Sequence, residues 1–497
     1  MKPENLPHRP SVVFVTAELA PFATSGGLGD VSRALPRALA ALGHRIAVVL
    51  PLYRSVRSRG VVLEPAATIE VPGWGGGVRV FHAPQALAPA SLYLIEHDHF
   101  FDRPGLYGEW GGEYGDNLER FSFFSRATLE AVAALGLPAD IVHANDWHTG
   151  LVPALLATVY RDHPVLGRTA TVFTIHNLGY QGRFAAARLA VTGLPASVFH
   201  MDGVEYYGEI NLMKAGIVYA RAITTVSPRY AEEIRTPELG EGLDGLLRAR
   251  GAHLTGIVNG IDDGMWNPIT DRHLAARYGA DSLDGKRVCK KALIDEMGLA
   301  VALDAPLAGM VTRLSAQKGG DILLGVADEA LRLGIVLCVL GSGESGLEDG
   351  FRALAARHAD RVGVRIGFDE ALSHRIEGGC DMFLMPSRYE PCGLNQMYSL
   401  RYGTVPIVHA TGGLDDTVRD PEEDAERPNG FKFRRPWGTD LVAAIARAVA
   451  AYRDRERWER MMRTGMAEDF SWRRSAARYG EIYVRLTAAT VGARRPA

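Results

Sequence analysis

The chain has 497 residues, 47% of them hydrophobic, which is enough for two or more domains. Lys and Arg number 55 against 58 Asp and Glu, a net charge of −3, so no strong attraction to nucleic acid or to a membrane is expected. The four cysteines lack CxxC spacing, the apolar run Val12–Val15 is too short for a signal-peptide core, and no run reaches the length of a membrane span. These features favour a cytoplasmic protein with reduced thiols.

Strand-like and helix-like runs alternate along the first half of the chain. Ser11–Thr16 reads as a buried strand, Asp30–Leu42 as an amphipathic helix and His44–Leu50 as the next strand. Further strand-like runs follow at Ser91–Glu96, Ile141–Ala144, Thr169–Ile175 and Ala222–Val226. This alternation is typical of a parallel sheet covered by helices.

The alternation begins again near residue 254. The expected strands are Leu254–Val258, Leu307–Thr312, Gly334–Leu340, Val362–Ile366, Met382–Met385 and Val405–His409. Two such series predict two doubly wound α/β domains, 1–253 and 254–468, with a ligand cleft between them.

The most informative segment runs from Met385 to Gln396. It places one carboxylate, Glu390, after a strand, where open α/β sheets bind ligands. A helix is expected from Leu394, and the backbone N–H groups near Gly393 at its start favour an anion. A carboxylate beside such a helix start suits a sugar joined to a phosphate.

Glycine-rich turns occupy matching places in the two halves. Thr24–Asp30 follows the first strand, and Thr411–Leu414 follows the strand that ends at His409. Their N–H groups could approach a phosphate, although turn geometry alone also explains the glycines. Neither turn is a GxGxxG fingerprint, which argues against a dinucleotide-binding oxidoreductase.

Two cations follow a strand of the second half. Arg313 and Lys318 lie between the strand Leu307–Thr312 and an expected helix, Asp321–Leu333. A diphosphate could bind this guanidinium and this ammonium group, whereas the alternative is that both are solvated.

Histidines mark two strand ends of the first half, in His143–His148 and in Thr174–Gly182. Both segments should face the cleft, although a hydrogen-bonded structural role is the usual one for a single histidine. His97-Asp98-His99 resembles part of a metal site, but no third or fourth ligand is apparent, so no metal site is expected.

These motifs, with Asn211–Gly216, Val258–Asp262 and Ser387–Gln396, occur in the order found in bacterial glycogen synthases and plant starch synthases. The resemblance runs from about Ser11 to Phe470-Ser471-Trp472 and the helix after it. It implies the GT-B fold, with two Rossmann-like domains and a C-terminal helix, 469–497, that returns to the first domain. It also implies transfer of glucose from ADP-glucose to the non-reducing end of an α-1,4-glucan with retention of configuration.

The resemblance assigns roles residue by residue. Arg313 and Lys318 match the pair that holds the diphosphate, His176 matches the active-site histidine and Glu390 the donor-site glutamate, and Asp146 completes the expected catalytic group. The other expected donor-site residues are Thr24, Gly26, Gly27, Asn177, Phe368, Cys392, Gly393, Leu394, Tyr398, Thr411, Gly412 and Gly413. Tyr107 and His148, with Asp146, are expected in the sugar and acceptor pocket. Phe368 stands where the family has a tyrosine against the base, and Tyr398 stands where many related retaining transferases have a second glutamate.

The chain departs from the family pattern at Thr24, where the motif Lys-x-Gly-Gly-Leu has lysine. Loss of that cation leaves UDP-glucose open as the preferred donor, and it leaves open a weakly active, glucan-binding paralogue. No cofactor beyond the nucleotide sugar is expected, and the sequence predicts no oligomeric state.

Overall fold

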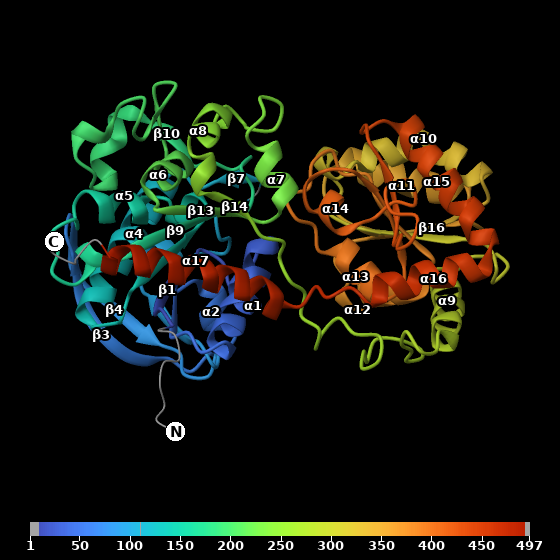
Figure 1. Cartoon of the computed structure of the whole chain (residues 1–497), viewed down its shortest axis with the longest axis horizontal. Coiled ribbons are helices and arrows are strands. Elements are labelled where there is room, and N and C mark those ends of the chain that lie inside the picture. Colours follow the sequence, from blue (N-terminus) through green and yellow to red (C-terminus); the bar gives the residue numbers. More distant parts are fainter. Residues whose placement is uncertain (1–8, 110, 493–497) are drawn as a thin grey trace. The chain divides into compact units, whose positions relative to one another are not determined.

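The computed structural model describes residues 9–109 and 111–492, with side chains to residue 488. The described residues form two compact units, the first within Met1–Val226, Ala231–Gly260 and Trp472–Ala497 and the second within Ser227–Tyr230 and Ile261–Ser471. Residues 1–8 and 493–497, the outer ends of the predicted segments 1–253 and 469–497, lie outside the described residues. The expected two-domain α/β architecture with parallel sheets is confirmed (Figure 1).

The first unit is built on a nine-stranded sheet. From one edge to the other its strands are β14 (Leu254–Gly256), β13 (Ala222–Thr225), β9 (Ala170–Ile175), β8 (Ile141–Asn145), β1 (Val12–Val15), β2 (Ile46–Pro51), β5 (Ser91–Ile95), β4 (Trp74–His82) and β3 (Glu64–Val71). The strands from β14 to β5 are parallel, and β4 and β3 add an antiparallel hairpin. The central strands are buried, as is usual in parallel sheets with helices on both faces.

Helices and two small sheets complete this unit. The helices are α1 (Gly27–Ala41), α2 (Arg54–Ser58), α3 (Asp98–Phe101), α4 (Asn117–Ala134), α5 (Leu151–Ala157), α6 (Leu212–Tyr219), α8 (Asp244–Ala249) and α17 (Trp472–Gly492), while α7 (Pro228–Glu233) has residues in both units. One small sheet has the order β10 (Arg183–Ala185), β12 (Glu209–Asn211), β11 (Glu205–Tyr206), and the other pairs β6 (Gly108–Glu109) with β7 (Gly112–Glu113).

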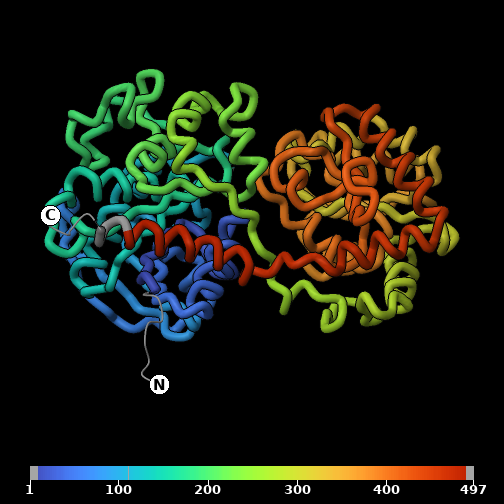
Figure 2. The backbone as a smooth tube through the Cα atoms, viewed as in Figure 1, coloured from blue at the N-terminus to red at the C-terminus, as the bar shows by residue number. Residues whose placement is uncertain are grey.

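The C-terminal helix α17 packs on the first unit, as expected. It lies beside α1 in Figures 1 and 2, where α17 is red and α1 is blue. Tyr483 of α17 is buried, and its hydroxyl lies 2.8 Å from Nδ1 of His143 in β8. The other ring nitrogen of His143 lies 2.5 Å from Oγ1 of Thr174, so this histidine ties the helix to the sheet.

The second unit has a six-stranded parallel sheet. Its order is β17 (Val362–Ile366), β16 (Val336–Gly341), β15 (Leu307–Val311), β18 (Met382–Met385), β19 (Val405–His409) and β20 (Phe431–Phe433). Its helices are α9 (Asp284–Glu296), α10 (Gly320–Arg332), α11 (Ser345–Arg357), α12 (Glu370–Gly379), α13 (Asn395–Arg401), α14 (Gly412–Thr417), α15 (Gly438–Arg453) and α16 (Arg455–Met466). One large core cluster joins this sheet to α10, α11, α15 and α16.

One expected strand was assigned to the wrong series. The run Leu254–Val258 was expected to open the second series, but its strand, β14, pairs in parallel with β13 at the edge of the first sheet. Ile223 lies opposite Leu254 and Thr225 opposite Gly256. The sequence of a short strand does not identify the sheet that the strand joins, because sheet membership depends on which strands it forms hydrogen bonds with.

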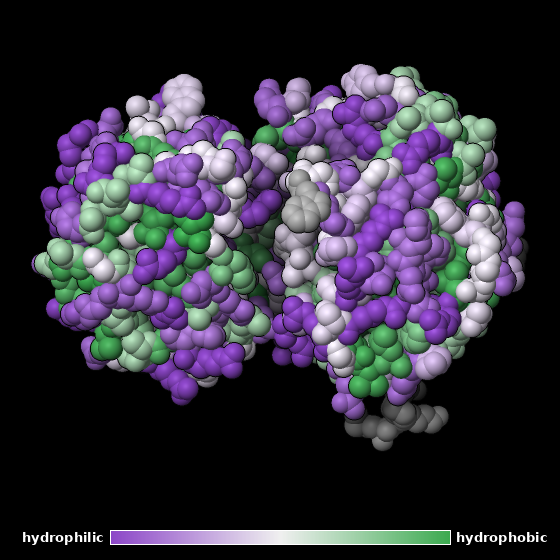
Figure 3. Space-filling model, turned by 180° about the vertical axis from the view of Figure 1, so that it is seen from behind, coloured by the Kyte–Doolittle hydropathy of each residue, from purple (hydrophilic) through white to green (hydrophobic). Residues whose placement is uncertain are grey.

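The surface is mixed in polarity. Figure 3 shows hydrophilic and hydrophobic residues interspersed in small groups over the visible face of each unit. Among the described residues, none of the helices combines the length and the apolar character that crossing a membrane requires.

Candidate active site

In the second unit, Lys318 and Glu390 form an ion pair at the carboxyl ends of β15 and β18. Lys318 closes the short 3-10 helix Ala316–Lys318, and its Nζ lies 2.6 Å from Oε2 of Glu390. The hydroxyl of Ser387 donates a hydrogen bond of 3.1 Å to the same oxygen. Both charged side chains are largely buried. The loop that follows each strand therefore brings together two residues that are 72 positions apart in the sequence.

Arg313 lies in the same pocket. This pocket has a volume of about 190 Å³, and Arg313, Lys318 and Glu390 line it together with Ser387, Gly393, Leu394 and Asn395. Arg313 is exposed, and within the residues that the structure describes its guanidinium makes no hydrogen bond or ion pair. A pocket with an open guanidinium and a lysine–carboxylate pair can hold an anion beside a polyhydroxyl group.

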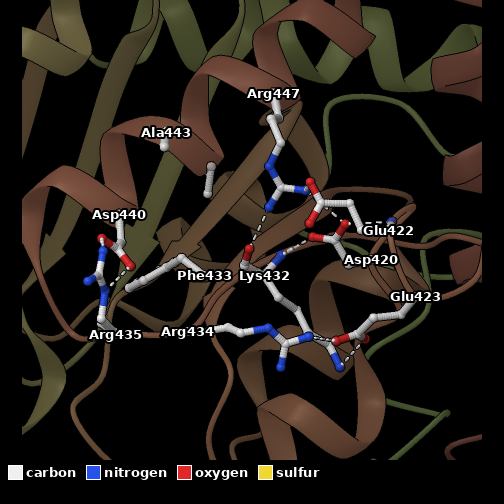
Figure 4. A pocket seen from close by; sticks show the side chains of 11 residues that line it. Asp420, Glu422, Glu423, Lys432, Phe433, Arg434, Arg435, Asp440, Ala443 and Arg447 are labelled. Atoms are coloured by element: carbon white, nitrogen blue, oxygen red, sulfur yellow. Dashed lines mark hydrogen bonds and ion pairs between the residues drawn. The ribbon is translucent and has the colours of Figure 1, made fainter.

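A larger pocket of the second unit differs in its electrostatics. It has a volume of about 380 Å³ and lies between β20, α15 and the loop before β20. Figure 4 shows its cations paired: Lys432 and Arg434 with Glu423, Arg435 with Asp440, and Arg447 with Asp420 and Glu422. Each of these cations already has a carboxylate partner, whereas Arg313 of the smaller pocket has none among the described residues, so the smaller pocket is the better anion site.

The Thr411–Leu414 turn packs on the loop that holds Glu390. Gly412 has a φ of +45°, and a Cβ atom there would lie 2.0 Å from the carbonyl oxygen of Glu390. The backbone N–H of Gly413 lies 3.2 Å from that same oxygen. These glycines are thus required for close packing of two backbone segments. The start of α14 therefore packs directly against the loop that contains Glu390 and Cys392.

Phe368 and Tyr398 lie outside the lining of the 190 Å³ pocket. Phe368 stands in the loop between β17 and α12 with 91% of its surface exposed, so its ring is open to stacking. The ring of Tyr398 stacks on Trp266 at a centroid distance of 3.9 Å, and Trp266 stacks on His374 at 3.8 Å. Trp266 was not among the predicted residues.

In the first unit, Asp146 and the 176–177 segment are joined by hydrogen bonds. Asp146 follows β8 with a φ of 55° and is buried. Its Oδ1 accepts a 2.7 Å hydrogen bond from the N–H of His176, and the N–H of Asn177 also donates to this carboxyl group. Burial nevertheless raises the pKa of Asp146 to about 7. Two predicted motifs from neighbouring strands therefore meet at this carboxyl group.

The imidazole of His176 is held beside β8. Its Nε2 lies 2.9 Å from Oδ1 of Asn145. Desolvation lowers the pKa of His176 to about 3, so the ring is neutral at physiological pH. If Nε2 carries the proton and donates a hydrogen bond to Oδ1 of Asn145, Nδ1 is left as an acceptor.

His148 stacks between two aromatic rings. Its centroid lies 4.4 Å from that of Tyr107 and 4.0 Å from that of Trp147. Only 6% of the residue is exposed, and neither ring nitrogen has a hydrogen-bond partner among the described residues. Burial, with a smaller contribution from the charge of Arg120, holds the pKa of His148 well below its usual value. The ring thus offers unpaired polar atoms in an apolar setting, which a ligand hydroxyl could satisfy.

Glu18, which was not predicted from the sequence, organises the first glycine-rich turn. The residue is 4% exposed. Its carboxylate accepts hydrogen bonds from Ser25 N at 2.8 Å, Ser25 Oγ at 2.6 Å and Gly26 N at 3.2 Å. The hydroxyl of Tyr107 also donates to it at 2.8 Å. A carboxylate just after β1 was a visible signal, because the other predicted residues also follow strands.

Thr24 is exposed at the mouth of this turn. Its hydroxyl donates a 3.2 Å hydrogen bond to the carbonyl oxygen of Gly26. Gly26 precedes α1, which begins at Gly27. The turn thus has the glycines and the helix start of the predicted motif, with a neutral side chain at the lysine position.

Comparison with known proteins gives a consistent family. Residues 11–249 match the family model described as Starch synthase catalytic domain, and residues 298–464 match Glycosyl transferases group 1. The chain is 47% identical over 474 residues to a glycogen synthase of Syntrophotalea carbinolica, covering 95% of this chain and 98% of the relative. It is 50% identical over 479 residues to a glycogen synthase of Anaeromyxobacter sp. strain Fw109-5, covering 96% and 99%.

A solved structure agrees. The catalytic domain of Starch Synthase IV from Arabidopsis thaliana, bound to ADP and acarbose, superposes with a TM-score of 0.88 at 35% identity, covering 97% of this chain and 100% of that one. The expected GT-B fold is thereby confirmed. With similarity that spans nearly the whole chain, the protein belongs to the glycogen synthase and starch synthase family of glycosyltransferases.

Proposed function

We propose that this glycosyltransferase is a glycogen synthase that transfers glucose from ADP-glucose to the non-reducing end of an α-1,4-glucan with retention of configuration. The observation that carries the proposal is the pocket in which the Lys318–Glu390 pair lies with the open guanidinium of Arg313. Such a pocket offers two cations for a diphosphate and one carboxylate for sugar hydroxyls.

The two cations would act on the leaving group. As glucose departs from ADP, negative charge grows on the β-phosphate. Arg313 and Lys318, fixed at that position, would stabilise the transition state more than the ground state, which is the condition for a higher rate. The carboxylate of Glu390 would hold the glucosyl unit by accepting hydrogen bonds from the hydroxyl groups of the sugar.

The first unit has groups of its own that suit a glucosyl unit. His176 is neutral, so it can take part in hydrogen bonds to the glucosyl unit without opposing its developing positive charge. Asp146 can support that charge when it is ionised, and the rings of Tyr107 and His148 offer flat surfaces to a pyranose.

Retention is proposed to follow a front-face path. A double displacement needs two carboxylates at short separation on either side of the reacting bond. In the proposed path, the oxygen of the departing phosphate accepts the proton of the incoming glucan hydroxyl, and the new bond forms on the face that ADP leaves. Trapping of a covalent glucosyl adduct on Glu390 or Asp146 during turnover would refute this path.

ADP-glucose is the proposed donor, and UDP-glucose is the competing one. The proposal is supported by the similarity to the Arabidopsis enzyme, which was solved with ADP. Thr24, in place of lysine, is the reason to keep the competitor. The reaction as proposed needs no cofactor, because cations of the protein would face the diphosphate. The proposed location of the protein is the cytoplasm.

The test offers ADP-glucose and UDP-glucose separately, each labelled in glucose, to the full chain with glycogen. We expect label in the polymer chiefly from ADP-glucose. A strong preference for UDP-glucose would overturn the choice of donor. Glycogen binding without release of nucleotide from either donor would favour the second candidate, a glucan-binding paralogue.

A further inference from the structure

Arg388 lies in the loop that carries Glu390, but it does not line the pocket of about 190 Å³. Its guanidinium contacts the segment that carries Lys318 instead. Nη1 and Nη2 of Arg388 donate hydrogen bonds of 2.7 Å and 2.6 Å to the two carboxylate oxygens of Asp321, in the first turn of α10. Nη1 also donates to the carbonyl oxygen of Ala316. This side chain therefore joins the two loops of the Lys318–Glu390 pair from outside the pocket.

Backbone contacts join the same two loops. The N–H of Arg388 donates a 2.8 Å hydrogen bond to the carbonyl oxygen of Gln317. Gly319 has a φ of +71°, and a Cβ atom there would lie 2.0 Å from the carbonyl oxygen of Pro386. Glycine at this position thus lets the two backbones approach closely. The contacts lie on both sides of Lys318 in the sequence, so the position of this residue depends on how the loops are joined.

The ion pair of Arg388 and Asp321 is suited to fixing geometry rather than to stabilising the fold. Their side chains are 40% and 43% exposed, and ion pairs in such positions add little to the free energy of unfolding. The planar guanidinium nevertheless meets the carboxylate with two parallel hydrogen bonds, which fix both the distance and the angle between the groups. Hydrogen bonds from Arg388 also lower the pKa of Asp321, which keeps the carboxylate ionised at neutral pH.

The Lys318–Glu390 pair is a poor means of holding the two loops while a donor is bound. Lys318 would then contact the phosphate and Glu390 the sugar hydroxyls, so the 2.6 Å contact between them would weaken. The hydroxyl of Ser387 supports Glu390, but Ser387 belongs to the same loop and does not join it to the other one. The contact between Arg388 and Asp321 uses none of these groups, so it can persist when the donor is bound.

We propose that Arg388, with Asp321 as its partner, is a positioning residue that keeps Lys318 at a fixed place relative to Glu390 during glucosyl transfer. The proposal rests on the proposed function, which assigns Lys318 to the diphosphate and Glu390 to the sugar. Without Arg388 the ammonium group would still be present, but it would no longer be fixed where negative charge develops. A displacement of about 1 Å can lower a rate by about a hundredfold.

The test is Arg388→Ala in the full chain, with glycogen at saturation and the preferred donor varied. We expect kcat to fall by about tenfold or more and the KM for the donor to rise much less, because a displaced cation affects the transition state more than the ground state. The midpoint of urea unfolding should stay close to that of wild type, since the pair is exposed. Arg388→Lys keeps the charge without the planar fork, so its kcat should lie between those of Arg388→Ala and wild type.

The matched control is Arg375→Ala. Nε and Nη2 of Arg375 each donate a 2.7 Å hydrogen bond to Glu296, so this is the same kind of two-bond ion pair in the same unit. It joins α12 to α9 and does not line the pocket, so its loss should leave kcat unchanged. Asp321→Ala should lower kcat as Arg388→Ala does. The double variant of Arg388 and Asp321 should lose no more than the more affected single variant, since the two residues act through one contact.

The outcomes separate this proposal from the proposed function. If wild type transfers glucose and Arg388→Ala keeps its kcat, Arg388 is not a positioning residue and the proposed function stands. The same holds if Arg375→Ala loses as much kcat as Arg388→Ala, or if the losses of Arg388→Ala and Asp321→Ala add up in the double variant. If wild type transfers no glucose from any donor, the proposed function fails, and calorimetric binding of ADP then decides the role of Arg388. A higher Kd in Arg388→Ala but not in Arg375→Ala would support it, whereas equal affinities, or no binding of ADP by wild type, would overturn it.

Discussion

Nζ of Lys318 lies 2.6 Å from Oε2 of Glu390, in loops that follow adjacent strands of the second sheet. A donor whose phosphate approaches Lys318 and whose glucose approaches Glu390 would be held by two members of a preformed pair. Preformed charges need little reorganisation during the reaction, which is what makes them effective in catalysis.

Replacement of the cation should therefore reduce turnover strongly. We expect Lys318→Ala to lower kcat by about a hundredfold or more, the usual loss for a group that stabilises developing negative charge. Steady-state kinetics with the preferred donor measure this. Arg434→Ala is the control, because Arg434 pairs with Glu423 in the other pocket and should keep full activity. Unchanged kcat in Lys318→Ala would contradict the assignment.

Glu18 and Tyr107 should be energetically coupled. Their hydrogen bond of 2.8 Å joins the glycine-rich turn to the ring that stacks on His148. In a double-mutant cycle of Glu18→Gln and Tyr107→Phe, we expect a coupling free energy of unfolding of about 1 kcal/mol or more.

Tyr53→Phe is the matched control for this cycle. Its hydroxyl is buried and has no hydrogen-bond partner among the described residues. Glu18→Gln combined with Tyr53→Phe should show a clearly smaller coupling. Equal coupling in the two cycles would mean that the Glu18–Tyr107 bond has no special role.

The titration of Asp146 should make the free energy of unfolding fall as the pH rises. Burial raises the pKa of Asp146 to about 7, whereas an unfolded aspartate titrates near about 4. Between these values the folded state keeps a proton that the unfolded state has released, so stability falls with increasing pH. Asp146→Asn removes this titration, and its free energy of unfolding relative to wild type should increase by about 2.5 kcal/mol from pH 5 to pH 8. Urea unfolding at both pH values measures this, and a constant difference would contradict the titration.

Much of the fold could be predicted from the sequence because the central strands are buried. Val336–Gly341 and Val12–Val15 are continuous apolar or small runs, and such runs stand out against the helices around them. The hairpin of β3 and β4 was not predicted, because it is a half-exposed edge of the sheet and its residues have no continuous apolar run. The helix α1 begins at Gly27, three residues before the predicted start at Asp30. Its first turn contains Gly27 and Gly29, and glycine is a poor helix former, so the sequence pattern does not indicate a helix there.

The candidate site was predicted in part for the same reason. Arg313, Lys318 and Glu390 follow strands of one sheet, so their meeting follows from the topology of parallel sheets. Glu18 and Trp266 were missed because their contacts, with Tyr107 and with Tyr398, join segments that are far apart in the sequence. Side-chain partners at such distances depend on the packed structure.

A cation at position 24 should strengthen donor binding. Thr24 is exposed beside the start of α1 and carries no charge. Thr24→Lys restores the residue of the family motif, and a charge-assisted hydrogen bond of about 1.5 kcal/mol or more should lower the KM for ADP-glucose about tenfold. Thr24→Gln is the control for side-chain length without charge. An equal effect of both variants, or none, would show that the donor phosphates do not come near this turn.

The central claim is glucosyl transfer at the pocket of Arg313, Lys318 and Glu390. Its most direct test is a single-turnover measurement of labelled glucose passing from ADP-glucose to glycogen, with wild type and Arg313→Ala at equal concentration. We predict transfer by wild type and a rate about a hundredfold lower in the variant. Equal rates in the two proteins, or no transfer by wild type, would contradict the account.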